Sequence, residues 1–181
     1  IPTTAAERYQ LSAEKVQAAW NSKTRGVLLA SPSNPTGTSI AQGELRRIHG
    51  VVQDRGGVTM IDEIYLGLSY DDAFGQTALA IDDNVISINS FSKYFNMTGW
   101  RLGYGAGPKA LIAAMAVVQS QATSCPSSIS QAAAVAALTG PQDVVRERCQ
   151  AFQARRDLVV AALNASPGLH CRVPEGAFYT F

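Results

Sequence analysis

The sequence has little charge and no long apolar run, and both shortages exclude classes of protein. Only 16% of its 181 residues are charged and the formal net charge is +1. Because lysine and arginine form no cluster, the electrostatic footprint of a nucleic-acid binder is absent. No apolar run approaches the ~20 residues that cross a bilayer. At 46% hydrophobic residues, the chain is too apolar for a disordered segment. We expect a folded protein that binds neither nucleic acid nor a membrane.

Cysteine and histidine are also scarce, and they form no pattern of metal ligands. Cys125, Cys149 and Cys171 are odd in number and widely spaced, without a C-x-x-C pair. We expect reduced thiols in a cytoplasmic protein, because structural disulfides are rare in that compartment. His49 lies in a charged, helical stretch and is expected at the surface.

The ends of the chain resemble cut points. The sequence begins at Ile1 rather than at a methionine, and it stops at Phe181 inside an apolar run. Its length fits one domain or one and a fraction. We expect the polypeptide to continue on both sides.

The first hundred residues alternate short apolar runs with helical segments. Runs bounded by turn residues predict four strands, over 26–30, 58–61, 85–89 and 101–106. Helices are expected over 12–20 and from about 39 to 55, the second opened by a capping box of Ser39 and Gln42. This alternation is typical of an α/β fold, with a mostly parallel sheet and helices on its faces.

The last eighty residues are expected to be mostly helical. The expected helices cover 108–121, 126–140 and 141–164. A pair of strands over 169–173 and 177–181 follows, joined by a turn at 174–176. We therefore divide the chain into a larger domain, residues 1–140, and a linking helix with the start of a smaller domain, residues 141–181.

Polar side chains follow the expected strands at the end where ligands of parallel α/β sheets bind. These side chains are Asn34, Asp62, Tyr65, Ser90, Lys93 and, at the start of the fourth strand, Arg101. Taken alone, each has an ordinary structural interpretation. Asn34 suits a turn and Asp62 a helix N-cap, while Lys93 and Arg101 suit the solvated surface.

Taken together, the six side chains match the needs of one cofactor. An aldehyde-bearing pyridine with a phosphate arm requires a lysine amine and an acid against the ring nitrogen. It also requires donors to the ring hydroxyl oxygen, and hydroxyl and guanidinium groups for the phosphate. The set contains every one of these groups.

Four linked segments resemble the class I/II aminotransferases, which are pyridoxal 5'-phosphate (PLP) enzymes of the fold type I group. The segments are Ser-Pro-Ser-Asn-Pro-Thr-Gly (31–37), Ile-Asp-Glu-Ile-Tyr (61–65), Ser-Phe-Ser-Lys (90–93) and Gly-Trp-Arg-Leu-Gly-Tyr (99–104). Pro-Glu-Gly-Ala-Phe-Tyr (174–179) resembles the family where its small domain begins. The resemblance covers nearly the whole chain.

The resemblance implies a role for each matching residue. Lys93 matches the lysine that forms the Schiff base with PLP and carries a proton to and from the substrate. Asp62 matches the partner of the pyridinium nitrogen. Asn34 and Tyr65 match the residues that bond the ring's phenolic oxygen.

The phosphate of the cofactor has two further matches, Ser90 and Arg101. The resemblance also implies a cis bond between Asn34 and Pro35, a homodimer, and transfer of an amino group from an amino acid to a 2-oxo acid. The family's aromatic residue stacked on the ring and its arginine for the substrate carboxylate have no match in these residues. We therefore expect this chain alone to be inactive.

Three alternatives stay open from the sequence. Another PLP reaction, such as a lyase or decarboxylase reaction, uses the same segments, because they report the cofactor rather than the reaction. A non-catalytic regulatory domain of aminotransferase type is the second. Ser90 and Lys93 also fit the S-x-x-K pattern of serine acyl-transfer enzymes, although the other motifs of that group are missing.

Overall fold

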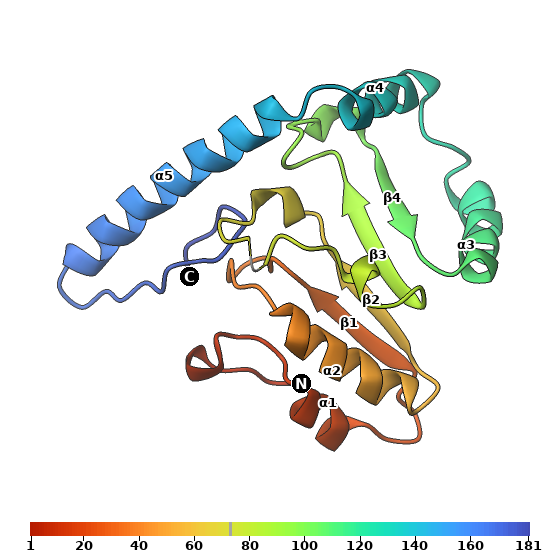
Figure 1. The fold of residues 1–181 in the computed structure, drawn as a ribbon, viewed down its shortest axis with the longest axis horizontal. Helices are drawn as coiled ribbons and strands as arrows, with labels where there is room; N and C mark the ends of the chain where they lie inside the picture. Colours follow the sequence, from red (N-terminus) through yellow and green to blue (C-terminus); the bar gives the residue numbers. More distant parts are fainter. Residues whose placement is uncertain (73) are drawn as a thin grey trace.

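A mixed sheet organises the chain (Figure 1). The computed structural model describes residues 1–72 and 74–181. In these residues the sheet has four strands in the order β1-β2-β3-β4. They are β1 (Gly26–Ala30), β2 (Val58–Asp62), β3 (Val85–Ser90) and β4 (Gly103–Ala106). The first three strands are parallel, so their carboxyl ends lie at one edge of the sheet. The predicted α/β fold with a mostly parallel sheet is confirmed.

The fourth strand differs from the others in direction and begins later than predicted. β4 pairs with β3 in antiparallel register, with Ser90 opposite Gly103. The chain reverses through a short 3-10 helix at Thr98–Trp100, without the crossover that a parallel neighbour needs. Arg101 has a φ of 50°, which an extended strand does not allow, so the strand starts only after it.

Two helices of the N-terminal half follow the prediction, one of them with a different start. In α1 (Ala13–Ala19), Ser12 caps the helix by accepting a hydrogen bond from Lys15 N at 3.3 Å. The second helix, α2 (Gln42–Gln53), has Ala41 at its N-cap and no side-chain cap, so the predicted capping box of Ser39 and Gln42 is wrong. The backbone N–H of Ser39 instead donates to the Glu175 carboxylate at 3.0 Å.

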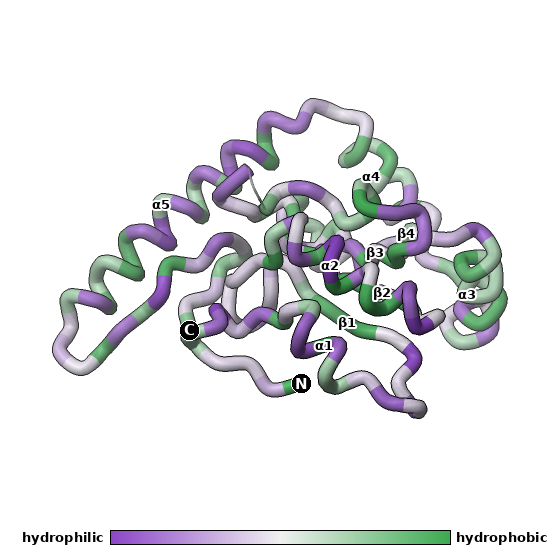
Figure 2. Tube along the Cα trace, turned by 60° about the horizontal axis from the view of Figure 1, so that its bottom comes forward, coloured by the Kyte–Doolittle hydropathy of each residue, from purple (hydrophilic) through white to green (hydrophobic). Residues whose placement is uncertain are grey.

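The C-terminal half contains three helices, as predicted. They are α3 (Lys109–Ala122), α4 (Ser128–Thr139) and α5 (Asp143–Ala165). Figure 2 shows many hydrophobic residues along α3 and α4, and among them Val118 and Ile129 are about 70% exposed. Along α5, hydrophobic and hydrophilic residues alternate. Among the described helices, none combines the length and hydropathy that crossing a bilayer requires.

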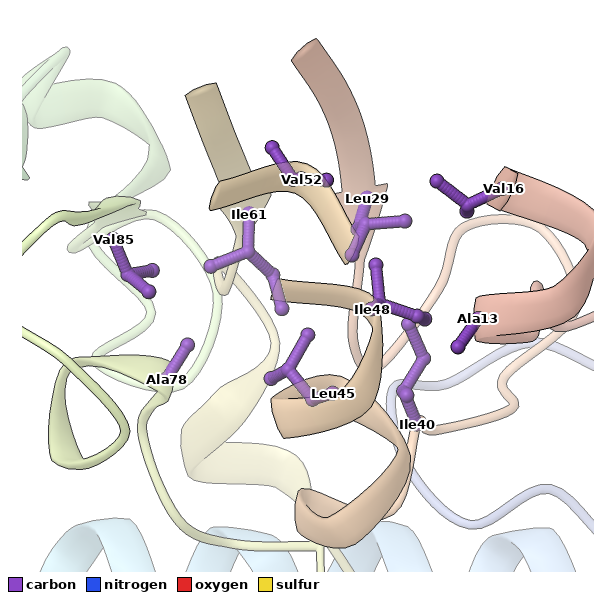
Figure 3. Close-up of a cluster of buried hydrophobic side chains, with 10 residues drawn as sticks. All are labelled: Ala13, Val16, Leu29, Ile40, Leu45, Ile48, Val52, Ile61, Ala78 and Val85. Atoms are coloured by element: carbon purple, nitrogen blue, oxygen red, sulfur yellow. The ribbon is translucent and has the colours of Figure 1, made fainter. Parts of the chain in front are cut away.

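The hydrophobic core lies between the sheet and the two N-terminal helices (Figure 3). From α2, Leu45, Ile48 and Val52 point toward the sheet. Leu29 of β1 and Ile61 of β2 meet them from the other side. The remaining buried members of this cluster are Ala13, Val16, Ile40, Ala78 and Val85. This packing fixes the first two strands and therefore the positions of the loops that follow them.

The predicted strand pair near the C-terminus does not form. Residues 169–173 are irregular, and Gly176 makes a single antiparallel bridge with Ser69. At Cys171, in the middle of the expected first strand, a side chain takes both backbone groups. Asn164 accepts a hydrogen bond from Cys171 N at 2.7 Å and donates to Cys171 O at 2.9 Å.

His49 is buried rather than at the surface, so this expectation is wrong. Its side chain lies on the core face of α2 and is only 5% exposed. Its Nδ1 lies 2.9 Å from the Thr59 hydroxyl, within hydrogen-bond distance. Its Nε2 lies 3.9 Å from an oxygen of Asp82. A polar partner on the neighbouring strand explains why an imidazole is tolerated there.

Replacing Ile48 with alanine tests the core. Because Ile48 is fully buried, we expect I48A to lower the free energy of unfolding by about 2–5 kcal/mol, through lost burial and the cavity left behind. The matched control is L158A, since Leu158 is 71% exposed on α5 and should change stability by less than about 0.5 kcal/mol. Chemical denaturation measures both, and equal losses in the two variants would contradict this account of the core.

Candidate active site

The loop after β1 is shaped by prolines and by close contact with the C-terminal segment. Both X–Pro bonds in it, Ser31–Pro32 and Asn34–Pro35, are cis, so the cis bond implied by the resemblance is confirmed. Gly37 has a φ of +65°, and a Cβ on it would lie 2.6 Å from Pro174 Cβ. Only glycine fits this conformation and this close approach without strain. The loop that carries Asn34 is therefore shaped by residues 174–176.

Asp62 ends β2 and caps the turn that follows it. One carboxylate oxygen, Oδ1, accepts a hydrogen bond from Ile64 N at 3.0 Å. Among the described residues, no donor lies on the second oxygen, Oδ2. The turn after β2 brings Tyr65 back toward Asp62, and the Tyr65 side chain is only 3% exposed. One oxygen of Asp62 thus fixes the side chain and leaves the other for a ligand.

Tyr65 is the centre of the site. Its hydroxyl hydrogen-bonds to the Tyr179 hydroxyl. Burial raises the pKa of Tyr65 above its usual range, and the hydrogen bond with Tyr179 and the charge of Asp62 raise it further. A hydrogen bond with the Asn34 side chain acts in the opposite direction on this pKa. Tyr65 therefore keeps its hydroxyl proton well above neutral pH, and Asn34 and Asp62 both lie close enough to act on its pKa.

Lys93 lies beside the same aromatic cluster. Its Nζ is 5.7 Å from the ring centre of Tyr65 and 5.9 Å from that of Phe178. In the part of the chain that the structure describes, no carboxylate pairs with this amine. It lines a cavity of about 430 Å³ together with Ser92, Asn96, Thr98, Arg148, Phe152, Arg155 and Phe178. An unpaired amine at a cavity wall is available for covalent chemistry.

Ser90 and Arg101 lie at the junction of β3 and β4. The Ser90 hydroxyl donates to Ser92 Oγ at 3.0 Å and lies 3.1 Å from the Leu102 carbonyl oxygen. Arg101 precedes Leu102 and is exposed, and its guanidinium donates to Thr98 O at 3.1 Å. The structure thus brings the two residues together through the backbone of Leu102, without a contact between their side chains.

The S-x-x-K interpretation has no geometry to support it. Within the described residues, the partners of the Ser90 hydroxyl are Ser92 and Leu102, and Lys93 is not among them. A serine nucleophile needs its base within hydrogen-bond reach.

Sequence reasoning assigned no role to Phe178 and Tyr179, which the structure places in the site. Both rings pack against Tyr65, with ring centres 5.3 and 5.5 Å away. They arrive there because Gly176 N donates to Gly37 O at 2.9 Å and Ala177 N donates to Leu68 O at 3.0 Å. The only signal in the sequence was an aromatic pair after a Pro-Glu-Gly turn.

Replacing Tyr179 with phenylalanine tests the hydrogen bond to Tyr65. Because this bond helps to raise the pKa of Tyr65, Y179F should lower that pKa, while burial keeps it above the usual value of about 10. A raised tyrosine pKa stabilises the fold below pH ~10 and loses this effect as the pH rises further. The loss of stability above pH 10 should therefore end at a lower pH, and be smaller in total, in Y179F than in the wild type.

Ultraviolet titration of tyrosine measures the pKa, with Y65F to assign the signal. Denaturation at a series of alkaline pH values measures the loss of stability. An unchanged Tyr65 pKa in Y179F would show that the two hydroxyls do not interact in solution.

Comparison with known proteins places this geometry in a family. The sequence profile described as aminotransferase class I and II matches residues 1–181. The aspartate aminotransferase of Rhizobium meliloti is 51% identical over 187 residues, which cover 100% of this chain and 45% of the relative. An aspartate/prephenate aminotransferase of Cereibacter sphaeroides is 43% identical over 178 residues, with 96% of this chain and 44% of the relative covered. The chain thus spans less than half the length of these curated relatives.

Solved structures agree with the sequence comparison. The crystal structure of the R. meliloti aspartate aminotransferase superposes with a TM-score of 0.93 at 50% identity, over 99% of this chain and 46% of that one. An aromatic aminotransferase from Pyrococcus horikoshii gives a TM-score of 0.92 at 34% identity, over 99% and 49% of the two chains. The chain belongs to the class I and II aminotransferase family.

Proposed function

We propose that this chain carries the lysine-bearing part of a PLP-dependent aminotransferase, which passes an amino group from an amino acid to a 2-oxo acid. One observation carries the proposal. Three separate segments come together at the carboxyl ends of β1, β2 and β3, and they bring Asn34, Asp62 and Lys93 close to Tyr65. Family membership supports the same conclusion.

The residues present fit PLP. Lys93 supplies an amine without an ion-pair partner among the described residues, and Asp62 has an oxygen without a donor there. The phosphate arm requires hydroxyl and guanidinium groups, which Ser90 and Arg101 supply from adjoining strand ends. When bound, PLP supplies an electron sink for negative charge at the substrate's α-carbon.

Each residue then has a defined task. The Nζ of Lys93 would hold the cofactor by its aldehyde carbon and would carry the proton to and from the substrate's α-carbon. The free oxygen of Asp62 would keep a proton on the ring nitrogen. The amide of Asn34 and the hydroxyl of Tyr65 would donate to the ring oxygen, since a tyrosine hydroxyl is protonated at neutral pH and burial raises the pKa of Tyr65 further.

We further propose an acidic amino acid, aspartate, as the amino donor. The R. meliloti relative is named an aspartate aminotransferase, and a Thermus thermophilus aspartate aminotransferase was solved with maleate, a dicarboxylate. In this chain, Arg148 and Arg155 line the cavity beside Lys93, and the residues that line it include no aspartate or glutamate. A positive lining of this kind favours a substrate with two carboxylates.

The other open alternatives have less support. The two curated relatives described above are both named aminotransferases, and neither is named a lyase, a decarboxylase or a regulatory protein. For the whole protein we propose a cytoplasmic homodimer, as the family resemblance implies.

Replacing Lys93 with alanine tests the proposed function. We expect the full-length wild type to bind PLP with a visible absorbance that borohydride bleaches, and K93A to lose it. Transfer from aspartate to 2-oxoglutarate, coupled to reduction of the oxaloacetate formed, should fall by on the order of a thousandfold or more. K109A is the matched control, because Lys109 is an exposed lysine at the start of α3.

Two results would contradict the proposal. A wild-type protein that releases ammonia from amino acids without forming a new amino acid would indicate a lyase. Unchanged cofactor absorbance in K93A would remove Lys93 from its role. Faster transfer from alanine than from aspartate would contradict only the choice of donor.

A further inference from the structure

Glu63 is a buried carboxylate that the proposed mechanism does not use. Its side chain is only 2% exposed. Its two oxygens accept three hydrogen bonds, from Ala78 N at 2.6 Å, Thr77 Oγ1 at 2.7 Å and Ser87 Oγ at 2.5 Å. Burying an ionised group is costly unless it is paired or fully hydrogen-bonded. Three donors from two other segments therefore satisfy the buried carboxylate of Glu63.

The donors tie the end of β2 to two neighbours. Ser87 lies within β3, and Thr77 and Ala78 begin a short 3-10 helix that packs against β3. The Thr77 hydroxyl also accepts from Leu79 N at 3.3 Å, so it connects that helix to Glu63. The Glu63 carboxylate therefore fixes the place where β2 ends.

Asp62 precedes Glu63 and points to the other face of the sheet, because successive side chains of a strand alternate. Ile61 and Glu63 are both buried, on the face that α2 covers, whereas Asp62 is half-buried. The backbone here is held on both sides. Ser31 N donates to Asp62 O at 3.0 Å, and Glu63 N donates to Ile88 O at 2.8 Å. Fixing the Glu63 side chain on one face thus determines the direction of Asp62 on the other.

We propose that Glu63 is a positioning residue for Asp62. Its hydrogen bonds hold residues 62–64 so that Asp62 Oδ1 stays on Ile64 N and the second oxygen stays directed to the ligand. Without them, Thr77, Ala78 and Ser87 lose a common acceptor, and the turn after β2 loses its anchor. The part that concerns PLP rests on the proposed function, whereas the hydrogen bond from Ile64 to Asp62 exists without the cofactor.

The test compares E63L and E63Q in the full-length protein, with and without PLP. E63L removes every acceptor, and we expect about tenfold faster hydrogen exchange at the Ile64 amide and about tenfold weaker PLP binding, as for one lost charge-assisted bond. E63Q should be intermediate, because both hydroxyls can rotate to accept from its amide. The matched control is T59V, which removes a buried hydrogen bond with His49 on the same strand and face. T59V should lower thermal stability without either effect.

A cycle with D62N separates positioning from general stability. If Glu63 acts through Asp62, E63L should change PLP binding less than twofold in the D62N background. Equal losses in both backgrounds, or unchanged exchange at Ile64 in E63Q and E63L, would overturn the proposal. If E63L does not fold, E63Q and S87A supply the same comparison. A wild type that binds no PLP would refute the proposed function, and the exchange at Ile64 would still decide the role of Glu63.

Discussion

The parallel pairing of β1, β2 and β3 is the constraint on which the rest of the structure depends. Parallel strands direct their carboxyl ends to one edge, so loops that are far apart in the sequence must meet there. The core between α2 and the sheet holds this pairing, with Ile48 and Ile61 fully buried. Asp62 ends β2, and Asn34 and Lys93 lie in the loops that follow β1 and β3, so all three belong to this edge of the sheet.

The second requirement is that the C-terminal segment closes on that edge. Gly37 and Gly176 lie where a larger residue would collide with Pro174 and with Pro32, respectively. Through this close contact the backbone of residues 174–177 bonds to Gly37 and Leu68, and Tyr179 reaches Tyr65. The site is thus formed by two surfaces, one from the sheet and one from the segment after α5.

The two faces of β2 differ in how far their polar side chains are buried and hydrogen-bonded. On the covered face, Thr59 and Glu63 are buried polar side chains, and each has partners on another element. On the opposite face, Asp62 keeps an oxygen that no described residue occupies. Successive side chains of a strand point to opposite faces. A buried, hydrogen-bonded side chain such as Glu63 can therefore lie one residue from a more accessible one such as Asp62.

Local patterns in the sequence determined the elements and the choice of site residues. Short runs bounded by turn residues predicted every strand of the sheet, and the polar residues near their ends supplied the candidate site. Prediction failed where a contact with a residue outside the local segment overrides the local sequence preference. Asn164 holds the backbone of Cys171, Thr59 gives His49 a buried partner, and Glu175 binds the Ser39 backbone. Only the tertiary structure revealed the contacts of Tyr179 and Glu63, because Tyr179 meets Tyr65 114 positions away and Ser87 meets Glu63 24 positions away. Such contacts depend on how strands and segments pack, and no periodicity within a single segment records them.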